Sequence, residues 1–177
     1  MARRAERAAF AELYDEQVWR VYGFFGYRVA CRDDAEDLTQ QTFERALRAW
    51  STFDPQRGQA ATWLLSIARN LLIDHYRRDR SRFRRPVEGD EAEDRLGSAP
   101  APEEELGIDP ELERALGGLG ERERELIALR FGGELTGPEI AEFTGLTLAN
   151  VQQILSRTLR RLHSELESSE LARRERA

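Results

Sequence analysis

The sequence predicts an all-α protein made of two small helical domains joined by an acidic, flexible linker. In both halves of the 177 residues, apolar side chains recur every three or four positions, which is the spacing of one helix face. No segment alternates apolar and polar residues as a half-buried strand does. Between the halves this pattern gives way to prolines, glycines and acids. We expect a first domain over 5–82, a linker over 83–109, a second domain over 110–166 and a polar tail over 167–177.

The first domain begins with two amphipathic helices. The first helix has its apolar face between residues 10 and 25. Gly23 and Gly26 weaken this helix and are consistent with the close approach of another backbone. A second helix is expected to open near Asp33 or Asp34, because aspartate caps helix N-termini well.

A loop and a third helix complete this domain. Residues 51–58 include Pro55 and Gly58, which interrupt helices. An apolar stripe then runs from Trp63 to Leu72 and ends in an arginine-rich segment. We therefore expect a bundle of three or four helices.

The net charge of −6 conceals two blocks of opposite sign. Residues 88–109 contain nine acids and one arginine, a net of −8, whereas residues 60–85 contain seven arginines and two aspartates, a net of +5. Every basic residue in the chain is arginine, so phosphate contacts would come from planar, permanently charged guanidinium groups. The acidic total therefore does not exclude a nucleic-acid partner.

The second half contains the spacing of a helix-turn-helix motif. Apolar periodicity resumes at residue 112, and two short helices are expected to flank Gly145, where the turn needs a left-handed backbone. Ala141 is small where the helices must approach, and Val151 would hold the second helix against the first. Such a second helix can enter the major groove. The same pattern would also suit a helix bundle that does not bind DNA.

Several classes of protein and site are not expected. Cys31 is the only cysteine, so an intramolecular disulfide is excluded, and we interpret it as structural, at a helix boundary. His75 and His163 lack neighbouring ligands at metal-binding spacing and are interpreted as capping or surface residues. We expect no catalytic residues, no metal, no cofactor and no enzyme activity. The start does not resemble a signal peptide and no apolar run approaches a membrane span, so we expect no membrane insertion and a cytoplasmic location.

Four segments carry a resemblance to a known family. Residues 27–43 (YRVACRDDAEDLTQQTF) resemble the polymerase-binding segment of extracytoplasmic-function (ECF) sigma factors. Residues 53–70 (FDPQRGQAATWLLSIARN) resemble their promoter-melting segment, and 126–131 with 139–141 are similar to their fourth domain. The resemblance covers about residues 10–80 and 111–165. It implies a dissociable subunit of bacterial RNA polymerase that melts and reads promoters.

The resemblance assigns a polymerase-binding surface to the second helix. In the family this segment binds the coiled coil of the polymerase clamp, and the expected partner is the core polymerase, through this coiled coil and its flap. Carboxylates and amides spaced three or four residues apart also suit an arginine-rich partner. A solvated helix face remains the alternative. The expected core-binding residues are Asp34, Glu36, Asp37, Gln40 and Gln41.

By the same resemblance, the loop after the second helix captures an unpaired base of the −10 promoter element. Holding such a base requires polar groups for its edge and aromatic surface for its face, and arginines further along would contact phosphates. Trp63 lies on the apolar stripe, so both core packing and base contact remain open for it. The expected −10 residues are Phe53, Asp54, Gln56, Arg57, Gln59, Trp63, Arg69, Asn70, Arg77 and Arg78.

The recognition helix departs from the family pattern. Two positions that are commonly basic are Gln152 and Ile154 here. The neighbouring amides can read adenine edges, but phosphate attraction must come from arginines later in the helix. Recognition of the −35 element is therefore either unusual in sequence or weak. The expected −35 residues are Thr147, Ala149, Asn150, Gln152, Gln153, Arg157, Arg160 and Arg161.

Three functional hypotheses follow from these features. The first is a sigma factor whose partners are the core polymerase, promoter DNA and an anti-sigma factor. The second is a sigma-like decoy or adaptor that binds an anti-sigma factor without engaging promoters, which the altered recognition helix keeps open. The third is an ordinary helix-turn-helix repressor, which the first domain argues against.

Overall fold

The computed structural model describes residues 2–56, 58–83 and 110–174, and its regular elements over these residues are all helical. This confirms the predicted all-α fold. Arg57, most of the expected linker and the last three residues of the expected tail lie outside the described residues. The elements are α1 (Ala2–Gly26), α2 (Arg32–Ala49), η1 (Trp50–Thr52), α3 (Ala60–Phe83), α4 (Pro110–Gly117), α5 (Glu121–Ile127), η2 (Ala128–Gly132), α6 (Gly137–Thr144) and α7 (Leu148–Arg174).

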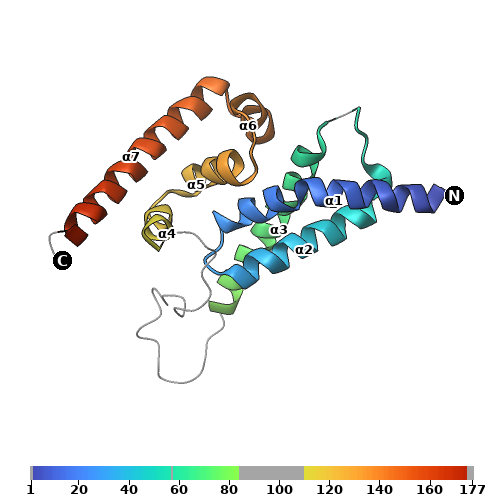
Figure 1. Ribbon diagram of the computed structural model, residues 1–177, viewed down its shortest axis with the longest axis horizontal. Helices are drawn as coiled ribbons and strands as arrows, with labels where there is room; N and C mark the ends of the chain where they lie inside the picture. Colours follow the sequence, from blue (N-terminus) through green and yellow to red (C-terminus); the bar gives the residue numbers. More distant parts are fainter. Residues whose placement is uncertain (1, 57, 84–109, 175–177) are drawn as a thin grey trace, which may run out of the picture.

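The helices α1, α2 and α3 pack against one another in an amino-terminal bundle (Figure 1). Its centre is fully buried and includes Phe24 and Phe25 of α1 and Leu64 and Leu71 of α3. Burying each such side chain contributes roughly 1.5–3 kcal/mol. The apolar stripes that the sequence predicts therefore face one shared core, although Leu47 of the second stripe is 53% exposed.

Helix α2 begins earlier than the sequence predicts. Its N-cap is Cys31, whose Sγ accepts a hydrogen bond from the backbone N–H of Asp34 at 3.4 Å. Burial raises the pKa of the Cys31 thiol. The prediction of Asp33 or Asp34 as the cap was wrong, because both lie in the first turn, where carboxylates also favour the positive helix end. The structural role expected for Cys31 is confirmed.

The helices α4 to α7 form a carboxy-terminal bundle. A buried cluster joins α4, α5 and α7 through Leu116, Leu119, Ile127 and Leu162. Helix α7 has 27 residues, so the expectation of a short helix was wrong. Its distal half continues because it has α4 to pack against, and Arg173 forms an ion pair with Glu111 of α4 at 3.1 Å.

The helix-turn-helix geometry is confirmed in α6 and α7. Gly145 ends α6 in the left-handed conformation, with a φ of 72°. Val151 is fully buried and holds α7 against the preceding helix, as its spacing predicts. The backbone N–H of Asn150 donates to Thr147 Oγ1 at 3.3 Å, which caps the start of α7.

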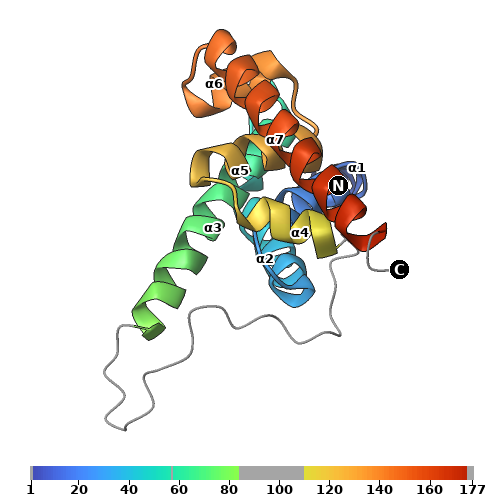
Figure 2. The ribbon, with the colours of Figure 1, turned by 90° about the vertical axis from the view of Figure 1, so that its left-hand side faces the viewer.

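The two bundles share one apolar core. Phe24 and Phe25 belong to the same buried cluster as Leu126, Leu129 and Leu135. The η2 turn, which follows α5, packs against α1 (Figures 1 and 2). At the closest point, a Cβ atom added to Gly132 would lie 2.4 Å from the carbonyl carbon of Gly23. This confirms that Gly23 permits the close approach of another backbone.

The left-handed turn yields a stability prediction. Gly145→Ala should lower the free energy of unfolding by about 1–2 kcal/mol, because a Cβ atom is unfavourable at positive φ. Urea denaturation of the full chain measures the change. Gly117→Ala is the matched control, because it ends a helix with open space around the added methyl group. Equal effects of the two substitutions would contradict the assignment of Gly145 as a conformational requirement.

Candidate DNA- and polymerase-binding surfaces

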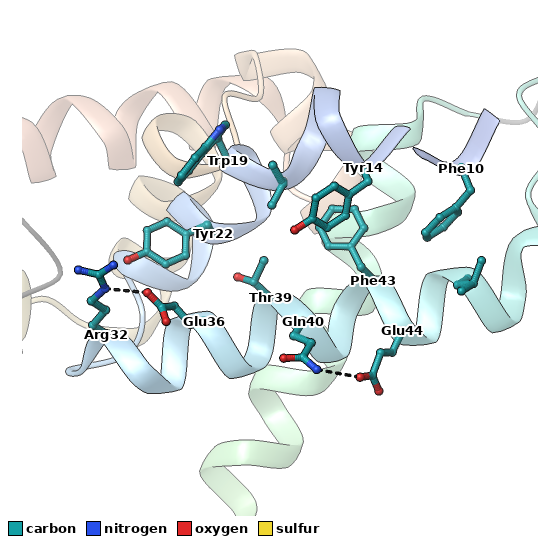
Figure 3. Close-up of a pocket in the computed structure, with 12 residues that line it drawn as sticks. Phe10, Tyr14, Trp19, Tyr22, Arg32, Glu36, Thr39, Gln40, Phe43 and Glu44 are labelled. Atoms are coloured by element: carbon teal, nitrogen blue, oxygen red, sulfur yellow. Dashed lines mark hydrogen bonds and ion pairs between the residues drawn. The ribbon is translucent and has the colours of Figure 1, made fainter. Parts of the chain in front are cut away.

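An aromatic groove runs between α1 and α2 (Figure 3). Tyr14 packs edge-on against Phe43, with ring centroids 4.7 Å apart, and Trp19 contacts Tyr22 in the same manner at 6.0 Å. Trp19 is 75% exposed, which is unusual for so large an apolar side chain. The hollow has a volume of about 660 Å³. Sequence reasoning placed Tyr14 and Tyr22 on a core-facing stripe and so missed this surface.

The five expected polymerase-binding residues of α2 do not all lie on the same side of the helix. Glu36 and Gln40 line the groove, where Glu36 pairs with Arg32 at 2.7 Å and Gln40 with Glu44 at 3.1 Å (Figure 3). Asp37 is exposed.

The other two expected residues of α2 are less exposed than Asp37. Asp34 and Gln41 are only partly exposed. An Asp34 carboxylate oxygen lies 3.8 Å from His75 Nε2 on α3. The Asp34 side chain is nevertheless 45% exposed, and α3 packs along the neighbouring side of α2.

The loop after α2 is supported by stacked aromatic rings. Trp50 stacks on Phe53 with ring centroids 5.4 Å apart, and Phe53 lies 4.9 Å from Trp63. Asp54 Oδ1 accepts the backbone N–H of Gln56 at 2.9 Å, which shapes the turn. Trp63 is partly exposed while packing against the core, so it has a packing role and an accessible face at once.

A cavity of about 550 Å³ brings most of the expected −10 residues together. Gln56 does not line it, and Arg77 and Arg78 are exposed further along α3. Glu139, Glu142 and Phe143 of α6 also line the cavity. The expected residues that line it are Phe53, Asp54, Gln59, Trp63, Arg69 and Asn70.

Two arginines at this cavity and beside it are already engaged. Arg69 Nε donates to Glu125 Oε1 at 2.6 Å, and its guanidinium lies 5.9 Å from the ring centroid of Phe143. Arg20 of α1 pairs with Glu134 at 2.9 Å. Sequence reasoning did not single out Arg20 or Glu125, because their partners lie in the other half of the chain.

The expected −35 residues are exposed on α7 and the turn before it. Arg161 differs from expectation, because it bonds Glu165 at 2.8 Å and the carbonyl of Gly118 at 3.0 Å, which directs it toward α4. Ile154 is partly buried and packs against the core. An apolar residue at position 154, where the family commonly has a basic one, is therefore explained by packing. Gln152 is exposed, so packing does not explain the other departure.

The first turn of α6 is held by Glu139, whose Oε2 accepts the hydroxyl of Thr136 at 2.6 Å and its backbone N–H at 2.7 Å. These two hydrogen bonds lower the pKa of the Glu139 carboxyl, and the bond from the Thr136 hydroxyl has the larger effect. A hydrogen bond from the Gln59 side chain lowers this pKa further. Glu139 thus stabilises the start of the helix-turn-helix motif and faces the amino-terminal bundle.

Comparison with known proteins identifies the family. The family model described as Sigma-70 region 2 matches residues 13–82, and that described as Sigma-70, region 4 matches residues 115–164. The ECF RNA polymerase sigma factor RpoE of Cereibacter sphaeroides is 31% identical over 91% of this chain and 88% of its own. The chain belongs to the ECF sigma factors. This family consists of transcription regulators without enzymatic activity.

Other ECF sigma factors align along the same length. The ECF RNA polymerase sigma factor BldN of Streptomyces coelicolor is 36% identical over 164 residues. That match covers 91% of this chain, but the chain spans only 61% of the length of BldN.

Two solved structures share the fold. The sigma factor RpoE, crystallised with the anti-sigma factor NepR from Bartonella quintana, has a TM-score of 0.68 and 24% identity over 90% of this chain and 97% of its own. CnrH, in complex with the cytosolic domain of CnrY, has a TM-score of 0.57 and 22% identity over 92% of this chain and 90% of its own.

In the part of the chain that the structure describes, no three His, Cys, Asp or Glu side chains are grouped to hold a metal ion. His163 pairs with Glu167 at 3.1 Å on the surface, which fits the surface role predicted for it. No helix among the described residues is sufficiently long and apolar to span a bilayer.

The cap on α6 predicts a pH dependence. Because the folded-state pKa of Glu139 is lowered, its contribution is present above the unfolded-state pKa and is lost as the pH falls through the folded-state value. Glu139→Gln should therefore destabilise the chain at neutral pH, by about 0.3–1 kcal/mol, and the difference should vanish in acid. Urea denaturation across pH measures it. Glu170→Gln, which alters an exposed carboxylate late in α7, is the control, and a pH-independent difference for Glu139→Gln would contradict this assignment.

Proposed function

We propose that this ECF sigma factor binds core RNA polymerase and directs promoter-specific initiation by melting and reading the −10 element and contacting the −35 element. The cavity beside α3 is the observation that carries the proposal. It joins aromatic faces, a carboxylate, an amide and a guanidinium in one place, which are the groups that an extruded base and its phosphates require.

The residues of this cavity divide into three tasks. The rings of Phe53 and Trp63 offer a stacking face, and the stacked Trp50 behind Phe53 keeps that face in place. Asp54 and Gln59 provide polar groups for the base edge. Arg69 lies at the far side, where it would neutralise a phosphate. Arg57, Arg77 and Arg78 are proposed to extend the contact along the DNA backbone.

The second DNA contact is proposed for the start of α7. Asn150, Gln152 and Gln153 are exposed there and can each pair with an adenine edge. Thr147 and Ala149 lie at the same end of the helix. Arg157 and Arg160 would supply phosphate contacts, whereas Arg161 is held toward α4 by Glu165 and Gly118 and would first have to leave them.

The polymerase contact is proposed for the exposed side of α2 together with the groove. Asp37 offers a carboxylate to an arginine-rich partner, and Glu36 and Gln40 border the aromatic hollow beside it. Trp19 adds a large apolar side chain, the type that most often dominates binding energy at interfaces. The proposed partner is the coiled coil of the polymerase clamp, with the flap contacting the carboxy-terminal bundle.

Regulation by an anti-sigma protein and a cytoplasmic location belong to the same proposal. The structures of RpoE and CnrH that share this fold contain an anti-sigma protein and a cytosolic domain of CnrY, respectively. A comparable partner of this chain would control its access to polymerase.

A decoy that binds such a partner without engaging promoters is the second candidate. Gln152 favours it, because an exposed cation is missing where the family commonly has one. The cavity beside α3 favours the sigma factor, because a decoy has no need for base-holding groups.

Run-off transcription with core polymerase, with and without the chain, tests the proposed function. Asp37→Arg should weaken association with core polymerase at least about tenfold, because it places a like charge opposite an arginine-rich surface. Co-purification measures association, and circular dichroism confirms the fold. Glu12→Arg, an equally exposed reversal on α1, is the control. Normal transcription and association in Asp37→Arg would show that the polymerase contact lies elsewhere, and a chain that binds an anti-sigma protein but yields no transcript would support the decoy.

The two DNA-reading surfaces should contribute unequally. Asp54→Ala should impair promoter opening more than Gln152→Ala impairs upstream binding, where about 1–3 kcal/mol per matched base is at stake. Asp54→Asn is the matched variant: it preserves the turn that Asp54 forms with Gln56 and removes only the charge. Permanganate footprinting and transcription on a promoter library measure both effects. The division of labour is wrong if Gln152→Ala abolishes transcription while the Asp54 variants behave as wild type.

A further inference from the structure

A chain of aromatic contacts runs from the first turns of α1 to the loop proposed to capture a base. Phe10 of α1 packs edge-on against Trp50, with ring centroids 5.4 Å apart and ring planes at 81°. Trp50 stacks on Phe53 and lies 6.2 Å from Trp63 of α3. Edge-on and offset-stacked contacts are the arrangements that aromatic pairs prefer. We call these four residues the aromatic ladder.

Two members of the ladder lie outside the residues expected to read the −10 element. Sequence reasoning named Phe53 and Trp63 for that task, but neither Phe10 nor Trp50. Phe10 also precedes residues 13–82, which the Sigma-70 region 2 model matches. The ladder therefore joins the loop to a part of α1 that this family model does not cover.

The loop relies on ring packing for its orientation. The backbone N–H of Phe53 donates to the carbonyl of Trp50 at 3.1 Å, and Asp54 accepts from the backbone of Gln56 at 2.9 Å. These bonds join residues at most three positions apart, so they fix the shape of the loop but not its direction relative to α1. A Cβ atom added to Gly58 would meet nothing within 4 Å, because the loop projects from the bundle there.

The orientation of Phe53 matters because a ring stacks on a base only when the two planes are nearly parallel. Phe53 is partly exposed, and its ring lies 4.9 Å from that of Trp63 at an angle of 35°. A side chain that is mobile before binding loses conformational entropy when it is ordered at an interface. Contact with Trp50 orders Phe53 in advance, and contact with Phe10 orders Trp50.

We propose that Phe10 and Trp50 are positioning residues for promoter opening: they hold Phe53 and Trp63 in the orientation in which these rings stack on an unpaired base of the −10 element. Neither Phe10 nor Trp50 is among the described residues that line the cavity, so each acts through its neighbour. The role in promoter opening rests on the function proposed above, whereas the ladder itself is a property of the folded chain.

Four variants separate ring positioning from general stability. Phe10→Ala removes the first ring, and Trp50→Leu removes the second ring while keeping an apolar side chain. Trp50→Phe is the conservative variant, because it keeps a ring between Phe10 and Phe53. Val29→Ala is the matched control. It removes buried apolar surface just before α2, at the end of that helix opposite Trp50, and so destabilises the bundle without reaching the ladder.

The first measurement follows the ladder in the free chain. Fluorinated tryptophan is incorporated at the three tryptophans, and fluorine NMR resonances are assigned with Trp→Phe variants. Trp63 is the informative residue, because the ring that Phe10 contacts is Trp50. Phe10→Ala should shift or broaden the Trp63 resonance, and Val29→Ala should leave it unchanged. An unchanged Trp63 resonance in Phe10→Ala would show that the ladder transmits nothing.

The second measurement is the rate of promoter opening by the holoenzyme. Phe10 also lines the groove proposed to contact polymerase, so the chain is added at concentrations that saturate the core enzyme. Phe10→Ala and Trp50→Leu should slow opening at least about fivefold, the low end of what one stacked base contributes. Trp50→Phe and Val29→Ala should stay close to the wild type. Equal slowing by Val29→Ala and Phe10→Ala would reduce the effect to stability and overturn the proposal.

Promoters with an abasic site show whether the effect passes through the stacked base. Each base of the −10 element is removed in turn, and one of these promoters lacks the base that Phe53 and Trp63 hold. On that promoter Phe10→Ala should slow opening no further, because two changes that act on one contact are not additive. An undiminished effect of Phe10→Ala on every abasic promoter would overturn the positioning role. A wild type that opens no promoter, with the fluorine shifts intact, would refute the proposed sigma function and this role with it, but not the ladder.

Discussion

The contact between the backbones of Gly23 and Gly132 is the constraint on which the arrangement of the two bundles depends. Only residues without a side chain allow α1 and the η2 turn to approach this closely. That approach brings Phe24 and Phe25 into one core with Leu126 and Leu129. The charged pairs around the core, and the position of α6 beside the cavity, both follow from it.

The features that depend on neighbours in the sequence could be predicted. The left-handed turn at Gly145 and the buried Val151 follow from spacing within one motif, because a helix-turn-helix is closed by contacts between residues a few positions apart. The loop residues that line the cavity were named from the resemblance to the promoter-melting segment of ECF sigma factors, and they lie together because the loop and the start of α3 are continuous in the chain. Their DNA-binding roles remain predictions.

The features that depend on distant parts of the chain could not be predicted. Gly23 indicated a close approach, but nothing in the local pattern identified Gly132 as its partner. Arg69 was assigned to DNA by the resemblance to the family, whereas its bond to Glu125 could be seen only in the folded structure. The N-cap of α2 was misplaced for a different reason: a thiol is a weak acceptor, and two aspartates beside it are stronger candidates by type.

The length of α7 has a mechanical consequence. A continuous helix of 27 residues is a rod about 40 Å long, with the amides proposed to contact the −35 element at one end and the contact with α4 at the other. Such a rod does not bend easily. A small rotation of α7 at the Arg173–Glu111 pair would therefore displace Asn150 and Gln152 at the opposite end of the helix, as a lever arm does. A ligand that binds only the distal end of α7 would thereby change the orientation of the amides at the other end without contacting them.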